Sequence, residues 1–241
     1  MLNRLAIAAA PLSLAACVIV VDAAPSDGNL GVDASFASQR GAEEGDVLAA
    51  EATLEPFSSV EASSGTEVIL TPGEAYTISL DDDARRRAFY EVEDDVLKVS
   101  CRRRSGWRGN CLRGDRGTLT VTLPRAEALR ASSGAVLTVE DGVTLGDALS
   151  LRASSGAVLT ARRDLGGVSS VEAKASSGAS LDARGVAAER GSADASSGAS
   201  IRLGTIRTAL DAEASSGADV TYEGDPQIER RVSSGGSVRG R

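Results

Sequence analysis

Residues 131–135 read Ala-Ser-Ser-Gly-Ala, and this phrase returns at nearly even intervals toward the end of the chain. Steps of 22, 22, 20, 19 and 18 residues separate its glycines, which are Gly134, Gly156, Gly178, Gly198, Gly217 and Gly235. A nearly constant period of about 20 residues is typical of a solenoid, in which each repeat buries its apolar side against its neighbours. The phrase therefore predicts stacked coils of about 20 residues over 129–241.

The residues around each glycine alternate between apolar and polar. The third position after it is always aliphatic: Leu137, Leu159, Leu181, Ile201, Val220 and Val238. Alternation with a period of two is typical of strands that bury one face and expose the other. In the first copy this parity places six side chains inside: Leu129, Ala131, Ser133, Ala135, Leu137 and Val139. The chain is therefore expected to be an all-β solenoid whose like residues stack about 4.8 Å apart.

The second serine of each phrase has the parity of an inward residue. If that parity persists through the bend at the glycine, the hydroxyls form an internal ladder: Ser133, Ser155, Ser177, Ser197, Ser216 and Ser234. Each hydroxyl would donate to one neighbour and accept from another, because an unpaired buried hydroxyl costs roughly 1–3 kcal/mol. A structural role is favoured over a row of nucleophiles, since an activated serine needs a partnered base.

A charged residue stands two positions before the first serine of each phrase, on the outward parity. This predicts an outer column of Arg130, Arg152, Lys174, Asp194, Glu213 and Arg231. The last copy departs from the pattern, because Arg230 occupies an inward position that is Leu or Ala in earlier copies. An atypical terminal repeat is expected, since an exposed end should not offer a bare apolar face.

Residues 1–16 have the organisation of a bacterial signal peptide. Arg4 precedes a short apolar run, and Leu14-Ala15-Ala16-Cys17 ends it. This segment resembles the lipobox of bacterial lipoproteins, which implies that Cys17 is acylated and becomes the mature N-terminus; a plain secretory signal is the alternative. The run is too short to span a bilayer. Val18 after the cysteine implies sorting to the outer membrane of a Gram-negative bacterium, on either its periplasmic or its surface side.

Residues 17–50 are rich in Ala, Gly, Asp and Ser without a sustained period, which predicts a flexible tether. Residues 51–241 form the folded domain, with N-terminal strands over 51–128. Five strands are expected within it, at 67–70, 76–80, 89–93, 96–101 and 118–123. Between 81 and 87, three acids precede three arginines, an order that suits one helical turn because it opposes the helix dipole. A solvated loop explains the same order.

Cys101 and Cys111 flank a loop rich in arginine. With Cys17 acylated, two cysteines remain in an oxidising compartment, which predicts a disulfide between them worth roughly 2–3 kcal/mol. The loop carries a candidate contact surface, because Trp and Arg are common interface anchors: Trp107, Arg103, Arg104 and Arg108. A loop that covers the solenoid edge is the alternative. The chain has no histidine and no second cysteine pair, so neither a metal centre nor a cofactor is expected.

The folded part resembles the bacterial envelope family called putative autotransporter adhesin, head GIN domain. The resemblance rests on the entry segment 57–65 (Phe-Ser-Ser-Val-Glu-Ala-Ser-Ser-Gly), the charged segment ending in Val-Leu-Lys-Val at 96–99, the strand 119–124 and the successive Ser-Ser-Gly phrases. It covers about 57–238, and its motifs are simple in composition. It implies a right-handed parallel β-helix in secreted or lipidated bacterial proteins, and it supplies no catalytic residues. The cysteine loop matches no motif of that family.

Composition and charge restrict the function. A net charge of −8 argues against nucleic acid, which calls for a basic face. We expect a non-enzymatic cell-envelope lipoprotein that binds or scaffolds a glycan or an envelope protein through the solenoid flank and is held to the membrane by its lipid. One alternative is a polysaccharide-acting enzyme that uses outward acids: Asp182, Asp194, Glu213 and Asp219. The other is an envelope-stress accessory that binds another protein. Nothing in the sequence indicates an oligomeric state.

Overall fold

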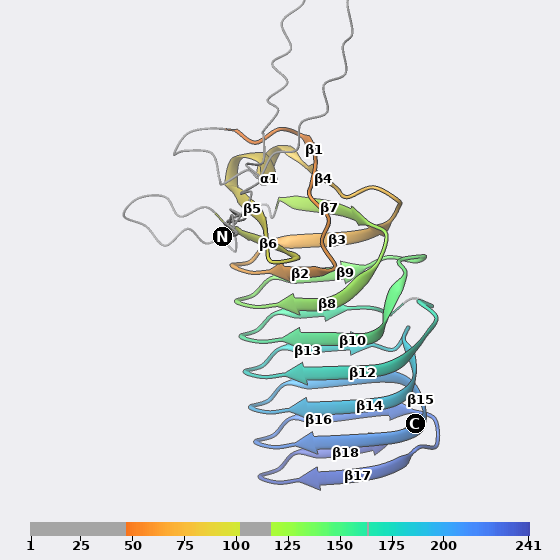
Figure 1. Cartoon of the computed structure of the whole chain (residues 1–241). Coiled ribbons are helices and arrows are strands. Elements are labelled where there is room, and N and C mark those ends of the chain that lie inside the picture. The colour runs from red at the N-terminus through yellow and green to blue at the C-terminus, as the bar shows by residue number, and fades with distance from the viewer. Residues whose placement is uncertain (1–46, 102–116, 163) are drawn as a thin grey trace, which may run out of the picture.

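The computed structural model describes residues 47–101, 117–162 and 164–241 as a right-handed β-solenoid with coils of about 21 residues and 3% helix. Two sheets face each other across a narrow core, and each coil contributes one strand to each sheet (Figure 1). The predicted fold class, an all-β parallel solenoid with coils of about 20 residues, is confirmed. No helix within these ranges is long and apolar enough to cross a membrane.

The strands of each sheet lie parallel from coil to coil. Sheet 1 contains, in spatial order, β6 (Val96–Cys101), β2 (Ser59–Ala62), β8 (Ala126–Ala131), β10 (Leu145–Ala153), β12 (Gly167–Ala175), β14 (Ala187–Ala195), the second part of β15 (Ser200–Ala214) and β17 (Gln227–Val232). Sheet 2 contains β7 (Thr118–Leu123), β3 (Glu67–Pro72), β9 (Val136–Val139), β11 (Val158–Thr160), β13 (Ser180–Ala183), the first part of β15, β16 (Asp219–Glu223) and β18 (Ser237–Gly240). Strand β15 runs through the bend from sheet 2 into sheet 1.

Antiparallel strands and one short helix close the N-terminal end of the solenoid. β4 (Thr77–Leu80) pairs with β7 and with β1 (Glu51–Thr53), and β5 (Ala88–Glu93) pairs with β6. Helix α1 (Asp82–Arg87) begins after Asp81, whose carboxylate accepts from the backbone N–H of Ala84 at 2.7 Å. The helical interpretation of 81–87 is therefore correct, and the five predicted strands are present.

The core consists of aliphatic columns that run through the coils. Leu159 pairs in register with Leu137 on one side and Leu181 on the other, and all three side chains are fully buried. The column continues through Ile201, Val220 and Val238. Sheet 1 faces it with a second column, of Val60, Leu129, Leu151, Ala173, Ala193 and Ala212. Stacking of like residues in successive coils is confirmed.

Each Ser-Ser-Gly phrase forms the turn that joins sheet 1 to sheet 2. Ser133 and Gly134 have φ angles of 50° and 74°, and the N–H of Ala135 donates to the carbonyl of Ser132 at 3.0 Å. Two successive positive φ angles with this hydrogen bond are typical of a type I′ turn. Because such residues reverse the chain, the strand parity ends at the turn and the second serine faces solvent. The predicted internal ladder of Ser133, Ser155, Ser177, Ser197, Ser216 and Ser234 is therefore wrong.

A backbone ladder connects the turns in place of the hydroxyls. The glycine N–H of each turn donates to the carbonyl of the second serine in the next coil, at 3.0–3.1 Å. Five consecutive bonds are formed in this way: Gly134 to Ser155, Gly156 to Ser177, Gly178 to Ser197, Gly198 to Ser216 and Gly217 to Ser234. The turns thus satisfy backbone groups that a bend would otherwise leave unpaired.

We expect Gly178→Ala to lower the free energy of unfolding by about 1 kcal/mol, because a side chain is strained at its φ of +70°. A Cβ at this position would meet no atom within 4 Å, so the cost is conformational and not steric. Gly167→Ala is the matched control, because this glycine does not adopt a positive φ and its nearest contact to an added Cβ is 3.9 Å. Urea denaturation of both variants measures the difference, and equal stability would contradict the proposed role of the glycine.

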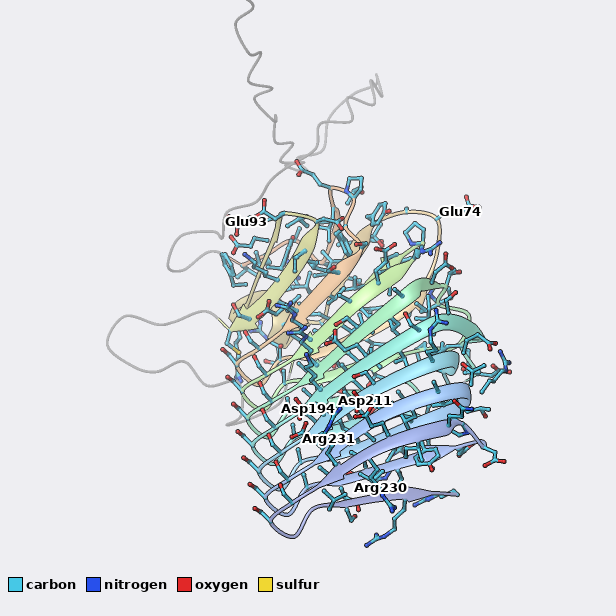
Figure 2. The ribbon with its side chains drawn as sticks, turned by 60° about the horizontal axis from the view of Figure 1, so that its bottom comes forward. Glu74, Glu93, Asp194, Asp211, Arg230 and Arg231 are labelled. Carbon is cyan, nitrogen blue, oxygen red and sulfur yellow. The ribbon has the colours of Figure 1, made fainter. Side chains whose placement is uncertain are left out.

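The last coil ends the solenoid with a charged residue. Arg230 extends the sheet 1 column beyond Ala212, and its Nη1 donates to the carbonyl of Val238 on the opposite sheet at 3.5 Å. Figure 2 shows Arg230 at the C-terminal end of the molecule. Ile228 and Val232 beside it remain 39% and 49% exposed. The expectation of an atypical terminal repeat is confirmed, although Arg230 covers only part of the apolar end.

Candidate functional site

A shallow groove of about 360 Å³ crosses the outer face of sheet 1, next to the serine turns. It extends over five coils, from β2 to β14. Its lining comes from equivalent positions in each coil: Glu61, Arg130, Ala131, Ser132, Arg152, Ala153, Ser154, Lys174, Ala175, Ser176, Asp194 and Ser196. The groove therefore presents equivalent positions coil after coil along the solenoid axis.

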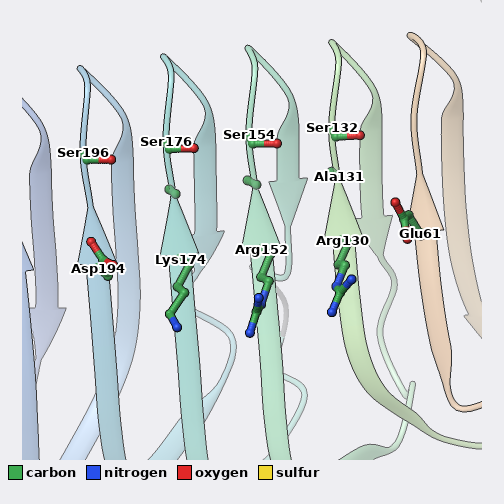
Figure 3. A pocket seen from close by; sticks show the side chains of 12 residues that line it. Glu61, Arg130, Ala131, Ser132, Arg152, Ser154, Lys174, Ser176, Asp194 and Ser196 are labelled. Atoms are coloured by element: carbon green, nitrogen blue, oxygen red, sulfur yellow. The ribbon is translucent and has the colours of Figure 1, made fainter.

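Two parallel rows of polar side chains form this groove, and Figure 3 shows both of them. The serine row contains the first serine of four successive phrases, namely Ser132, Ser154, Ser176 and Ser196. The charged row contains Glu61, Arg130, Arg152, Lys174 and Asp194, which pair in register on neighbouring strands. Since neighbouring strands lie about 4.8 Å apart, each row repeats at that interval. The predicted outer charged column is thus confirmed and belongs to a groove.

Strand parity explains why both rows face outward. Arg152 stands between the buried residues Leu151 and Ala153, so its side chain points away from the core. Ser154 follows Ala153 at the start of the turn, and its N–H donates to the carbonyl of Ala131 in the preceding coil at 3.0 Å. Within the described part of the chain, the hydroxyls of the serine row have no protein hydrogen-bond partner. These hydroxyls are therefore available to water or to a ligand.

Glu172 partly neutralises two cations of the groove. Glu172 lies 3.5 Å from Nη2 of Arg152 and 2.6 Å from Nζ of Lys174. The hydrogen bond from Lys174 is the main reason that the pKa of Glu172 lies below its ordinary value. Arg130 is exposed and has no ion-pair partner among the described residues. The centre of the groove therefore keeps an excess of positive charge.

A second charge cluster lies on sheet 2, around Asp182. Its carboxylate accepts from Nε of Arg162 at 2.7 Å and from Nε and Nη2 of Arg184 at 3.0 and 2.9 Å, while Nη1 of Arg202 lies 4.0 Å away. Only 3% of the Asp182 side chain is exposed. Burial alone raises the pKa of Asp182, but the hydrogen bonds from Arg184 and Arg162 outweigh it, and the pKa lies below its ordinary value. The cluster connects three successive coils. Because its own arginines already bind the Asp182 carboxylate, this group is not available to a ligand.

The four acids considered for catalysis do not converge. Asp194 and Glu213 are register neighbours on the exposed face of sheet 1. Asp182 lies on sheet 2 under its arginines, and Asp219, also on sheet 2, contacts Ser237 and Nη1 of Arg239. Over the described ranges, no group of three His, Cys, Asp or Glu side chains is placed to hold a metal ion.

Several predicted site residues cannot be placed. Cys101 is buried at the end of β6. Its predicted disulfide partner Cys111 lies outside the described residues, together with Trp107, Arg103, Arg104, Arg108 and Cys17. The disulfide, the contact surface and the acylation therefore stay predictions.

The groove itself was not predicted, although the sequence contained a signal for it. The first serine of each phrase and the charged residue two positions earlier share the outward parity, as Arg130 and Ser132 illustrate. Two outward rows at this spacing must lie side by side in every coil.

Comparisons with known proteins agree with this architecture. A crystal structure of a putative adhesin from Bacteroides fragilis is 14% identical, with a TM-score of 0.56, and the match covers 79% of this chain and 93% of that one. Putative adhesins from Parabacteroides distasonis (12% identity, TM-score 0.49, covering 79% and 95%) and Parabacteroides merdae (15%, 0.43, covering 82% and 97%) have lower TM-scores. At such identities the Bacteroides fragilis structure supports the fold alone.

No curated protein matches the chain. The family model described as putative auto-transporter adhesin, head GIN domain, matches residues 56–226, which is well over half of the chain. This range includes every strand of the groove and most of the Ser-Ser-Gly turns. The chain therefore belongs to the putative auto-transporter adhesin, head GIN domain family.

Proposed function

We propose that this protein is a non-enzymatic, adhesin-like binding module of the bacterial cell envelope that uses the flank of its solenoid. The observation that carries the proposal is the groove of Figure 3, where serine hydroxyls that have no partner among the described residues lie beside a row of charges over successive coils. A catalytic centre needs different groups that converge on one reacting bond. A repeating groove instead offers the same contacts several times, which suits binding of an extended partner.

The leader supports a location at the membrane surface. We propose that Cys17 carries the lipid, that the outer membrane of a Gram-negative bacterium is its destination, and that the tether expected at 17–50 holds the solenoid away from the bilayer. The tether ends before Leu48, which is buried in the core and donates its N–H to the carbonyl of Arg85 at 3.0 Å. A tethered solenoid would present its long flank to partners in the surrounding space. Membership of an adhesin-named family supports a role in the cell envelope.

One observation favours the enzymatic alternative. Asp194 and Glu213 stand on neighbouring strands about 4.8 Å apart, which is close to the carboxylate separation of about 5 Å in retaining glycosidases. Both side chains are exposed, however. A general acid requires an environment that raises its pKa, usually through burial. We therefore propose binding in preference to hydrolysis.

A panel of envelope and extracellular polysaccharides, presented to the detergent-solubilised full-length protein, tests the proposal. We expect retention of at least one glycan without the appearance of reducing ends or unsaturated products. We also expect Ser154→Ala combined with Ser176→Ala to weaken retention several-fold, since each lost hydrogen bond is worth about 1 kcal/mol. The matched control is Ser155→Ala with Ser177→Ala, at the exposed apex of the same turns.

The outcomes of this panel separate the three functions. New reducing ends would replace the binding proposal with the polysaccharide-acting enzyme. If no glycan is retained and cross-linking instead captures one envelope protein in a groove-dependent manner, the accessory-protein alternative is correct. Equal loss of binding in both double variants would exclude the groove as the binding surface.

A further inference from the structure

We propose that the groove binds a linear acidic polysaccharide whose units carry both a carboxylate and hydroxyl groups, with the sugar chain running along the solenoid axis across β8, β10 and β12. This inference rests on the proposed binding function and names its ligand class. The geometry points to it because the groove presents two different chemistries in two parallel rows.

The charged row provides one cation in each of three successive coils: Arg130, Arg152 and Lys174. A guanidinium binds a carboxylate through two parallel hydrogen bonds, and an ammonium binds it as a point charge. The serine row provides one hydroxyl in each of the same coils, which can donate to a sugar oxygen and accept from a sugar hydroxyl. A partner that uses both rows must therefore repeat an acid group beside hydroxyl groups.

The charges of the groove determine that its ligand is an anion and how many coils the ligand contacts. Arg130 has no ion-pair partner among the described residues, while Arg152 and Lys174 share the single carboxylate of Glu172. On β8, β10 and β12 three cations face the one carboxylate of Glu172, so these three coils are locally positive, whereas Glu61 and Asp194 bring the groove as a whole to three cations and three carboxylates. A carboxylate stands at each end of the charged row, Glu61 at one end and Asp194 at the other. An acidic chain is thus attracted over three coils and repelled beyond them.

The composition of the groove distinguishes this ligand from other polyanions. Proteins that bind single-stranded nucleic acid stack its bases on aromatic side chains, and among the described residues no aromatic side chain lines the groove. A phospholipid headgroup offers one anionic group at one place, so it would use one coil and leave the repeat without a role. A carboxylated polysaccharide uses the three cations of the charged row together with the serine hydroxyls of the same coils.

The test measures binding of the detergent-solubilised full-length protein to polygalacturonate, to its fully methyl-esterified form and to a neutral glucan. We expect micromolar or tighter binding to polygalacturonate, at least tenfold weaker binding to the ester, and a loss of affinity as salt rises. With oligogalacturonates, affinity should rise with length until three carboxylates are present and then level off. Binding of the ester with undiminished affinity would overturn the inference, since esterification removes the carboxylate charges on which it depends.

A pair of variants locates the contact. Arg130→Glu is expected to weaken binding to polygalacturonate by about tenfold or more, because it removes one attraction and adds a repulsion. Arg190→Glu, on β14 of the same sheet, is the matched control, since Arg190 is also exposed, has no ion-pair partner in the described chain and lies outside the groove. The control should change affinity less than twofold, and circular dichroism verifies that both variants are folded.

Failure of the inference can be distinguished from failure of the proposed function. If the ester or the neutral glucan binds as well as polygalacturonate and the serine variants weaken it, the groove is a binding site but its ligand is not acidic. If Arg190→Glu and Arg130→Glu weaken binding equally, only the overall charge matters and the groove is not the site. If none of these polysaccharides binds, the acidic ligand is excluded, and the wider glycan panel alone decides the binding function.

Discussion

Leu159→Ala should lower the free energy of unfolding by about 3 kcal/mol, within the range for buried leucines. Leu159 is fully buried in the middle of the sheet 2 column and packs in register between Leu137 and Leu181. Removing its side chain leaves a cavity that the coils above and below cannot close independently, because each is fixed to its neighbours by a parallel ladder. Thermal and urea denaturation followed by circular dichroism measure the loss.

Val158→Ala is the matched control for this prediction. Val158 is the preceding residue of the same strand, but its side chain points outward and is 36% exposed. A surface substitution of this kind usually changes stability by less than about 0.5 kcal/mol. Similar losses in the two variants would mean that Leu159 does not stand in a stacked core column, and the solenoid interpretation would fail with it.

Asp182→Asn should lower the free energy of unfolding by about 2 kcal/mol at neutral pH, the usual value for hydrogen bonds to a charged group. The amide keeps the shape of the side chain but loses the charge that holds Arg162 and Arg184. The full cost of breaking a buried ion pair is not expected, because the arginines are 57% and 36% exposed and can be rehydrated. Urea denaturation at pH 7 measures the difference.

The pH dependence of this effect has a definite sign. The pKa of Asp182 lies below its ordinary value in the folded state. The carboxylate therefore contributes its full stabilisation above the unfolded pKa of about 3.9, and this contribution is lost as pH falls through the lower folded value. The gap between wild type and Asp182→Asn should accordingly narrow below about pH 4. A gap that widens there would contradict the assignment.

Asp194→Asn is the control for both measurements. Asp194 is an exposed acid of sheet 1 and has no ion-pair partner in the described part of the chain. It should leave stability almost unchanged at either pH. A loss as large as that of Asp182→Asn would show that overall charge, and not the buried cluster, determines the effect.

The sequence was most informative where a period persists over many coils. The aliphatic position after each glycine and the charged position before each phrase were assigned to the correct faces, because alternation along a strand fixes which way a side chain points. The same argument failed at Ser133, one residue before the glycine. Parity applies only while the backbone is extended, and the φ of 50° at Ser133 ends that extension.

Only part of the candidate site could be predicted from the sequence. The charged column was predicted, but the serine row beside it was not, and Asp182 was considered only as an outward acid of the enzymatic alternative. Asp182 does lie at an outward position of β13. Its burial comes from Arg162 and Arg202, about 20 residues away on either side in sequence, which the stacking of coils brings over it. Which long side chains meet on a surface depends on register, and an alternating pattern does not specify that.

At the N-terminal end, the sequence likewise predicted the strands but not the order in which their coils stack. The sequence indicated strands between the first Ser-Ser-Gly phrase and the later ones, and β3 to β7 are those strands. The sequence did not indicate that β2 pairs with both β6 and β8. Because of this pairing, the coil formed by β6 and β7 lies beyond the coil formed by β2 and β3, at the N-terminal end of the solenoid. Long-range pairing of this kind depends on which strand edges remain free after the repeats have stacked.

The repeated phrase by itself indicated a β-solenoid, because a period of about 20 residues combined with period-two alternation around each glycine suits a coil of strands joined by turns. Only the tertiary structure decided that the serines lie outside, that Asp182 is enclosed by arginines, and that two outward rows form a groove. The physical reason is that periodicity describes one coil, whereas a binding surface consists of contacts between coils. Those contacts depend on backbone turns and on register.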